Sequence, residues 1–245
     1  MPLHQPDIQG DGPCDCGLFF LDVVGAYQRD QVQLEWSDTR RSTNEELERL
    51  IDQAWQLATW QARKNGQSLY DGDLCRLIDY RAESDRLGLT LGKVSYKEFV
   101  GTNQTQAYVR YLHGSEVLAD PLGVSSALIT NDGFIFLARR SESVMQYGGR
   151  IHPVGGIVEP VNGSADPPDP FEAMLLEIME EVHISADHVQ AMTVLGLVRD
   201  KNTVQPELIF DLRLNMDAAT VRRSAASAVD AHEHTEMVLV RDHPA

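Results

Sequence analysis

Basic residues are scarce in this chain of 245 residues. Lysine and arginine together number 21, against 37 aspartate and glutamate residues, which gives a formal net charge of −16. Affinity for nucleic acids rests largely on clustered lysine and arginine side chains, so this balance argues against a nucleic-acid partner. The acidic surplus mainly favours solubility.

Cysteine is equally rare, with three residues at positions 14, 16 and 75. An odd number in a chain of this size is typical of reduced thiols rather than of a disulfide framework. Cys14 and Cys16 form a Cys-x-Cys pair without a second pair to complete a metal site, so we interpret them as part of an irregular N-terminal tail.

Long apolar runs are also missing. No run approaches the roughly 18 apolar residues that a membrane-spanning helix requires. The segment MPLHQPDIQGDGPCDC lacks the basic region and the apolar region of a signal peptide. We therefore expect a cytoplasmic protein that has no membrane partner.

The first part of the chain, residues 1–117, is predicted to form a small α+β region after a flexible lead-in over residues 1–17. GLFFLDVV is predicted to be a strand. A helix is predicted from Ser42, which would form a capping box with Glu45, to Gly66. The segments LCRLIDYRA and LGLTLGKVSY flank a polar turn and predict a hairpin.

The second part, residues 118–245, is predicted to be an α/β (α+β) domain with a mixed β-sheet sandwiched between helices. Two strands flank Asn131, Asp132 and Gly133, a sequence typical of hairpin turns. A Gly/Pro-rich loop, an acidic helix and a strand pair follow. A further helix around DAATVRRSAASA and a final strand TEMVLVR complete the domain.

The acidic helix carries three glutamates on an otherwise apolar stretch, FEAMLLEIMEEVHI. At about 100° per residue, Glu177, Glu180 and Glu181 share one face. Asp169 and Pro170 would open the helix, so these glutamates lie in its last turns, where the helix dipole disfavours anions. A divalent cation such as Mg²⁺ would offset their repulsion. The alternative is a solvated polar face, and the spacing alone leaves both open.

Two glycines, Gly155 and Gly156, stand in HPVGGIVEP upstream of this helix. Paired glycines let the backbone approach a ligand or metal closely, which suits a tight loop that directs a carbonyl oxygen into a site.

Together these residues resemble the Nudix hydrolase family, whose sequence box is Gly-x5-Glu-x7-Arg-Glu-U-x-Glu-Glu-x-Gly-U, with U an aliphatic residue. Gly156 matches the first glycine, and the box's second half is matched by Glu177, Ile178, Glu180, Glu181 and Ile184. The resemblance implies a Nudix fold, with metal ligation by the three glutamates and the Gly155 carbonyl. It also implies Mg²⁺ as cofactor, with Mn²⁺ as a substitute, and catalytic roles for Glu177 and Glu181.

The chain departs from the box at three positions. The first glutamate of the box would fall at Asn162, its arginine is Leu176, and its last glycine is His183. The loop is also longer, being filled by GSADPPDP. The arginine normally helps to orient a catalytic glutamate, so the change to Leu176 bears on the geometry and the rate and leaves the metal ligands in place.

A narrower resemblance, carried by SYKEFVGTN, LADPLGVSSALIT, LARRSESV and DAHEHTEM, is to the UDP-sugar diphosphatase branch of the Nudix enzymes. It implies hydrolysis of UDP-glucose or UDP-galactose to UMP and sugar 1-phosphate. The alternatives are the same chemistry on ADP-ribose, dinucleotides or coenzyme A derivatives, or a degenerate Nudix module that binds a nucleotide as a sensor. Oligomeric state stays open.

Further site residues are hypotheses. Glu233 precedes the last strand, where Nudix enzymes often bring in an additional glutamate, and would activate water or bind a second metal. Glu236 is the second choice for this role. His232 and His234 lack a third zinc ligand, so we interpret them as polar surface.

Substrate contacts are predicted from cationic and amide side chains. Arg139 or Arg140 would hold a phosphate, because guanidinium matches phosphate oxygens with two parallel hydrogen bonds. Arg150 is another anion-binding candidate. Asn103, with Thr102, would contact sugar or uracil, although a turn at the end of a helix explains these residues equally well.

Overall fold

The computed structural model describes residues 14, 15, 17, 19–141, 148–161, 166–229 and 234–242. Within them, one large sheet contains strands β1 (Cys14–Asp15), β2 (Phe19–Tyr27), β6 (Gly123–Ile129), β7 (Phe134–Arg140), β8 (Ile151–His152), β9 (Val154–Ile157), β10 (Val189–Asp200), β11 (Pro206–Leu214) and β12 (His234–Arg241). Their order is β1-β2-β10-β11-β6-β7-β12, with β8 beside β7 and β9 beside β6. β6 and β11 are parallel and the other pairs are antiparallel, so the predicted mixed sheet is confirmed.

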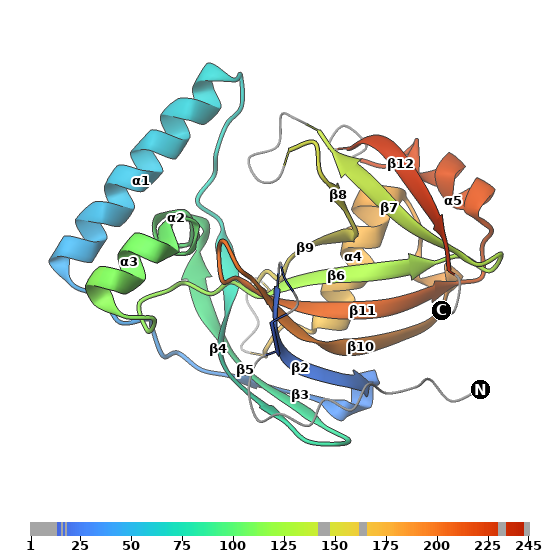
Figure 1. The fold of residues 1–245 in the computed structure, drawn as a ribbon, viewed down its shortest axis with the longest axis horizontal. Helices are drawn as coiled ribbons and strands as arrows, with labels where there is room; N and C mark the ends of the chain where they lie inside the picture. Colours follow the sequence, from blue (N-terminus) through green and yellow to red (C-terminus); the bar gives the residue numbers. More distant parts are fainter. Residues whose placement is uncertain are drawn as a thin grey trace.

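The second sheet contains β3 (Val32–Trp36), β4 (Asp73–Ala82) and β5 (Leu87–Ser95), in the order β3-β5-β4. The helices are α1 (Glu45–Lys64), α2 (Tyr96–Gly101), α3 (Gln106–His113), α4 (Pro170–Val182) and α5 (Ala218–Ala225). Figure 1 shows α1, α2 and α3 grouped beside the end of the large sheet where β6 begins, and α4 against one face of that sheet. No helix in the described residues is long and apolar enough to span a membrane.

The acidic helix α4 forms as its sequence predicts. The Asp169 side chain accepts a hydrogen bond from the Phe171 backbone N–H, Pro170 occupies the first turn, and His183 ends the helix in the left-handed conformation. Met174 and Ile178 are fully buried against the sheet. The Phe171 ring meets that of Phe210 on β11 edge to face, with 5.1 Å between centroids.

The predicted hairpins are also confirmed. β6 and β7 are joined through Asn131, Asp132 and Gly133, and Gly133 has a positive φ of 78° that suits glycine. β4 and β5 pair antiparallel, with Leu89 of β5 facing the core.

The predicted start of the first long helix is wrong. The helix begins at Glu45, and its N-cap is Asn44, whose side chain accepts a hydrogen bond from the Leu47 backbone N–H. Asparagine caps as well as serine does, so the nearer residue takes the position that we assigned to Ser42. The end of the helix is as predicted, since Gly66 follows it with a φ of 73°.

The two parts of the chain both contribute to the main hydrophobic core and are joined through their backbones. β2 pairs with β10 inside the large sheet, so a division at residue 117 does not separate the two sheets. On β4, the Cys75 N–H donates to the Val158 carbonyl, and the Cys75 carbonyl accepts from the Leu122 N–H. These bonds place β4 against the start of β6 and the end of β9, two strands that carry the candidate site.

Candidate active site

A cavity of about 1050 Å³ lies where the N-terminal helices meet the large sheet. Its floor is made by β11, β6 and β9, whose residues fall into two rows across the strands. The first row is Glu207, Gly123 and Ile157, and the second row is Ile209, Ser125 and Gly155. We call these six residues the cavity floor.

Two of the three predicted metal ligands on α4 reach this cavity. Glu177 and Glu181 line it, whereas Glu180, from the same helix, is half-buried outside the lining. Glu181 is 4% exposed, and its Oε2 accepts a hydrogen bond from the Gly155 backbone N–H at 3.3 Å. This bond ties the acidic helix to the edge of the cavity floor.

The glycine pair explains how the helix can come so close. A Cβ atom at Gly155 would lie 2.2 Å from the Val124 carbonyl oxygen, and one at Gly156 would lie 2.1 Å from Glu177 Oε1. Both distances are far below van der Waals contact. Glycine at position 155 is therefore required for the approach of strand β9 to β6, and glycine at position 156 leaves the Glu177 carboxylate in its place. The carboxylate of Glu177 occupies the space that a side chain at position 156 would take.

The donor set suits a hard divalent cation. Carboxylate oxygens and a backbone carbonyl are typical ligands of Mg²⁺, which usually completes its shell with water and substrate phosphates. Among the described residues, no three histidine, cysteine, aspartate or glutamate side chains are grouped so that they could hold a metal by themselves. An ion bound here would therefore depend on the Gly155 carbonyl, water and substrate in addition to the glutamates.

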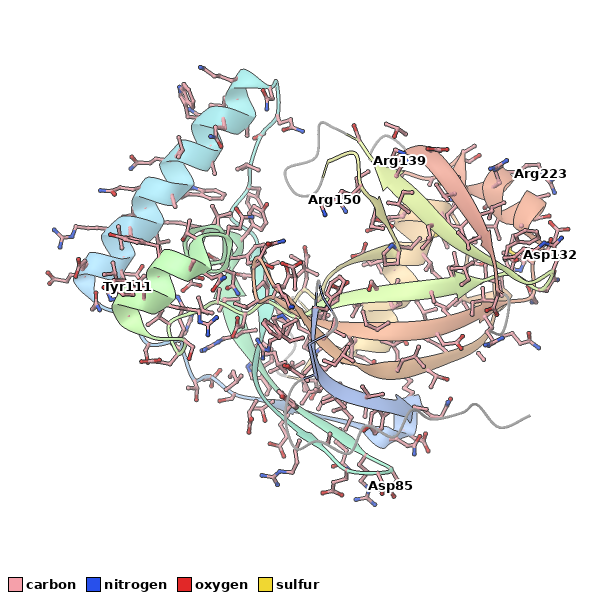
Figure 2. All side chains as sticks on the ribbon, viewed as in Figure 1. Asp85, Tyr111, Asp132, Arg139, Arg150 and Arg223 are labelled. Atoms are coloured by element: carbon pink, nitrogen blue, oxygen red, sulfur yellow. The ribbon has the colours of Figure 1, made fainter. Side chains whose placement is uncertain are left out.

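The two adjacent arginines on β7 face different surroundings. Arg140 lines the cavity, together with Arg150 from the segment that enters β8. Arg139 Nε donates to Glu236 Oε2 of β12 at 2.8 Å, and its Nη1 donates to the Gly149 carbonyl. Figure 2 shows Arg150 directed toward the N-terminal part of the chain, with Arg139 on the outer part of β7.

Asn103 is not placed to contact a substrate. It is fully buried, donates to Asp120 Oδ1 at 2.8 Å and to the Thr203 carbonyl at 3.0 Å, and accepts from the Asp120 N–H. Asp120 has a positive φ of 45° and Val204 one of 51°, so Asn103 holds two strained loops together. Its amide group holds Thr203, which lines the cavity, in position and does not point into the cavity.

Other predicted residues lie away from the described cavity or outside the described residues. Glu233, His232 and Asn162 lie outside the described residues, and of His234 only the backbone is described. Glu236 is held by its ion pair with Arg139 on the neighbouring strand.

Several residues of the cavity lining were not predicted from sequence. Phe19, Gln67, Ser68, Leu69, Tyr96 and Phe99 come from the N-terminal part, and Asp200, Asn202, Thr203, Gln205, Glu207 and Ile209 come from the β10–β11 hairpin. One sequence signal was available, because Glu207 is an acidic residue within the otherwise apolar strand segment PELIF. A charged side chain inside such a strand indicates a site when it faces a cavity.

Comparisons with known proteins point in one direction. No protein-family model matches the chain. Nudix hydrolase 9 of Arabidopsis thaliana is 26% identical over 79% of this chain and 72% of its own length. The uridine diphosphate glucose pyrophosphatase NUDT22 of Mus musculus is 28% identical over 92% of this chain and 81% of its own length, and that of Homo sapiens is 29% identical over 75% and 70%.

Solved structures give more distant likenesses. A MutT protein from Methanosarcina mazei has a TM-score of 0.33 and 22% identity, covering 49% of this chain and 76% of its own. The support for the resemblance to Nudix hydrolases, stated from the sequence, therefore comes from the curated relatives and from the site residues. It is confirmed: along most of its length, this chain is similar to proteins named Nudix hydrolase 9 and uridine diphosphate glucose pyrophosphatase.

Proposed function

We propose that this protein is a Mg²⁺-dependent Nudix hydrolase that cleaves the diphosphate of a nucleoside diphosphate linked to a second group. The observation that carries the proposal is the meeting of Glu177 and Glu181 with Arg140 and Arg150 around one cavity. Carboxylates that suit a cation and arginines that suit phosphate are the two kinds of group that a charged diphosphate requires.

Each group has a distinct part in the proposed reaction. Glu177, Glu181 and the Gly155 carbonyl would hold the cation, which when bound would offset phosphate charge and acidify water. Arg140 and Arg150 would bind and orient the phosphate oxygens. Phosphoryl transfer needs little from a protein beyond placement and electrostatics, so these groups are of the kinds that the reaction requires.

The preferred substrate is UDP-glucose or UDP-galactose, with UMP and sugar 1-phosphate as products. The support is that the mouse and human relatives, which match 92% and 75% of this chain, are named as uridine diphosphate glucose pyrophosphatases. ADP-ribose, dinucleotides and coenzyme A derivatives are the alternatives within the same chemistry.

A nucleotide sensor without catalysis is the second candidate function. Leu176, which stands where the Nudix box has arginine, is 55% exposed on α4, so this position supplies no cation to orient a glutamate. Retention of Glu177 and Glu181 in the cavity favours the enzyme.

The first test is product formation from UDP-glucose, UDP-galactose, ADP-ribose, NADH and coenzyme A, with Mg²⁺ and with EDTA, resolved by chromatography. We expect UMP and sugar 1-phosphate from the UDP-sugars, and no product in EDTA. Cleavage of another substrate would discard the uridine preference. Nucleotide binding without any cleavage would favour the sensor.

The Glu181→Gln variant tests the acidic helix itself. The amide keeps the size of the side chain and an acceptor for the Gly155 N–H but loses the charge that a cation requires, so we expect Mg²⁺-dependent turnover to fall at least about hundredfold. Chromatographic rates, with circular dichroism to verify the fold, make the measurement.

Glu172→Gln is the matched control. Glu172 lies in the first turn of the same helix and forms an exposed ion pair with Arg29. Exposed pairs contribute little, so this variant should keep full activity. Unchanged turnover in Glu181→Gln would refute the role of α4.

A further inference from the structure

Glu207 and Gln205 lie at the opposite side of the cavity floor from the α4 carboxylates. Glu207 is on β11, and Gly155, which contacts Glu181, is on β9 with β6 between them. Two interstrand steps of about 4.8 Å therefore separate the two strands by about 10 Å. A ligand held at the carboxylate side must span about this distance to reach Glu207.

Gly123 provides the room for both side chains. A Cβ atom at position 123 would lie 3.2 Å from Glu207 Cγ and 3.3 Å from Gln205 Nε2. Both side chains thus lie over the bare backbone of β6, next to each other and within the lining of the cavity. A carboxyl and a carboxamide side by side offer a paired set of hydrogen-bonding groups.

The surroundings of Glu207 differ from those of an exposed glutamate. Burial raises the pKa of Glu207, the charge of Asp200 raises it further, and a hydrogen bond with the Ser125 side chain opposes the rise. A phosphate beside Glu207 would add a second negative charge to that of Asp200, which already disfavours the ionised carboxylate, so a phosphate group is a poor occupant. An uncharged group that donates hydrogen bonds suits it better.

We propose that Glu207 and Gln205 select the uncharged, hydrogen-bond-donating half of the substrate, either the hydroxyls of a sugar or the imide N–H of a base. The inference rests on the proposed function, because it assumes that the diphosphate is held near Glu177 and Glu181. A site built to hydrogen-bond a donor discriminates strongly against ligands that lack one, because its own polar groups then stay buried without partners.

The test is calorimetric binding of UDP-glucose, UDP and inorganic diphosphate to the full chain, with Ca²⁺, which carboxylates also bind, in place of Mg²⁺ to limit turnover. Glu207→Ala should weaken UDP-glucose binding about tenfold or more and leave inorganic diphosphate binding within twofold. Weaker UDP binding would place the base at Glu207, and unchanged UDP binding would place the sugar there. Glu207→Gln should recover part of the affinity, because its amide still offers an acceptor.

Stability separates this role from a structural one. Glu207 is half-buried, and a glutamate whose pKa is raised in the folded state destabilises the fold increasingly as the pH rises from its ordinary pKa to the raised one. Glu207→Ala should therefore unfold in urea at neutral pH no earlier than the wild type. Glu172→Ala, in the first turn of α4 and outside the cavity lining, is the control and should bind like the wild type.

The outcomes distinguish a failure of the Glu207 selection role from a failure of the proposed function. If UDP-glucose binds to Glu207→Ala as tightly as to the wild type, the selection role is refuted while the proposed function stands. If the wild type binds neither UDP-glucose nor inorganic diphosphate, the proposed function fails and this inference with it. Equal weakening of UDP-glucose and inorganic diphosphate would also refute selection, because it would assign Glu207 a general effect on the site.

Discussion

At the scale of single residues, a side chain added at Gly156 should reduce activity, whereas one added at Gly155 should reduce stability. An added Cβ at Gly156 meets the end of the Glu177 side chain, which can rotate away. We therefore expect Gly156→Ala to fold normally, with an unfolding free energy within about 1 kcal/mol of the wild type. Its kcat/KM should fall by about hundredfold, because a carboxylate displaced by an ångström or more is misplaced for its task. Steady-state kinetics and urea unfolding test this pair of expectations.

Gly155→Ala is the contrasting substitution. Its Cβ meets the Val124 carbonyl oxygen and the Ser125 backbone, neither of which can rotate away, so strand β9 must move from β6. We expect a loss of about 1–3 kcal/mol in unfolding free energy, the usual cost of overpacking. If both variants lost the same stability, the assignment of separate failures would be wrong.

At the scale of elements, the end of α4 shows what one departure from the Nudix box costs, namely His183 in place of glycine. His183 has a φ of 55° and a ψ of 44°, the left-handed conformation in which glycine commonly ends helices. A side chain in this conformation costs about 1–2 kcal/mol, and glycine loses part of that gain to its own flexibility. We expect His183→Gly to raise the unfolding free energy by about 1 kcal/mol in urea without changing turnover. A loss of stability would show that the imidazole makes a contact of greater value.

The elements that were predicted correctly are those specified by local pattern. α4 follows from Asp169, Pro170 and its apolar face, and the β6–β7 hairpin follows from Asn131, Asp132 and Gly133. For Asn103 the sequence left a substrate contact and a turn at a helix end open, because an amide near a helix end has the same sequence signature in both cases. In the structure its amide holds two loops together. The part of the cavity lining made by Tyr96 and Phe99 depends on the packing of distant segments, which no local pattern contains.

At the scale of the whole molecule, residues 118–245 are not expected to fold without the rest. β2 covers one side of β10, and Leu87, Leu89 and Leu91 of β5 belong to the same core as α4. Removing them would expose β10 as an open sheet edge together with a large apolar surface. We expect the isolated fragment 118–245 to show no cooperative thermal transition and to bind the dye ANS. A sharp transition in calorimetry would instead support a separate domain.

The position of Cys75 gives this joined architecture a built-in chemical reporter. Its thiol is fully buried where β4 meets Val158 and Leu122, and burial, with the nearby Glu159 charge, raises its pKa to about 12. Iodoacetamide reacts with thiolates, so alkylation of Cys75 requires that β4 first separate from the large sheet. The alkylation rate, followed for the Cys75 peptide by mass spectrometry, therefore measures how often β4 separates from Leu122 and Val158. We call this contact the seam between the two sheets. Because the cavity walls come from both sides of that seam, a bound substrate should slow the labelling in proportion to its occupancy.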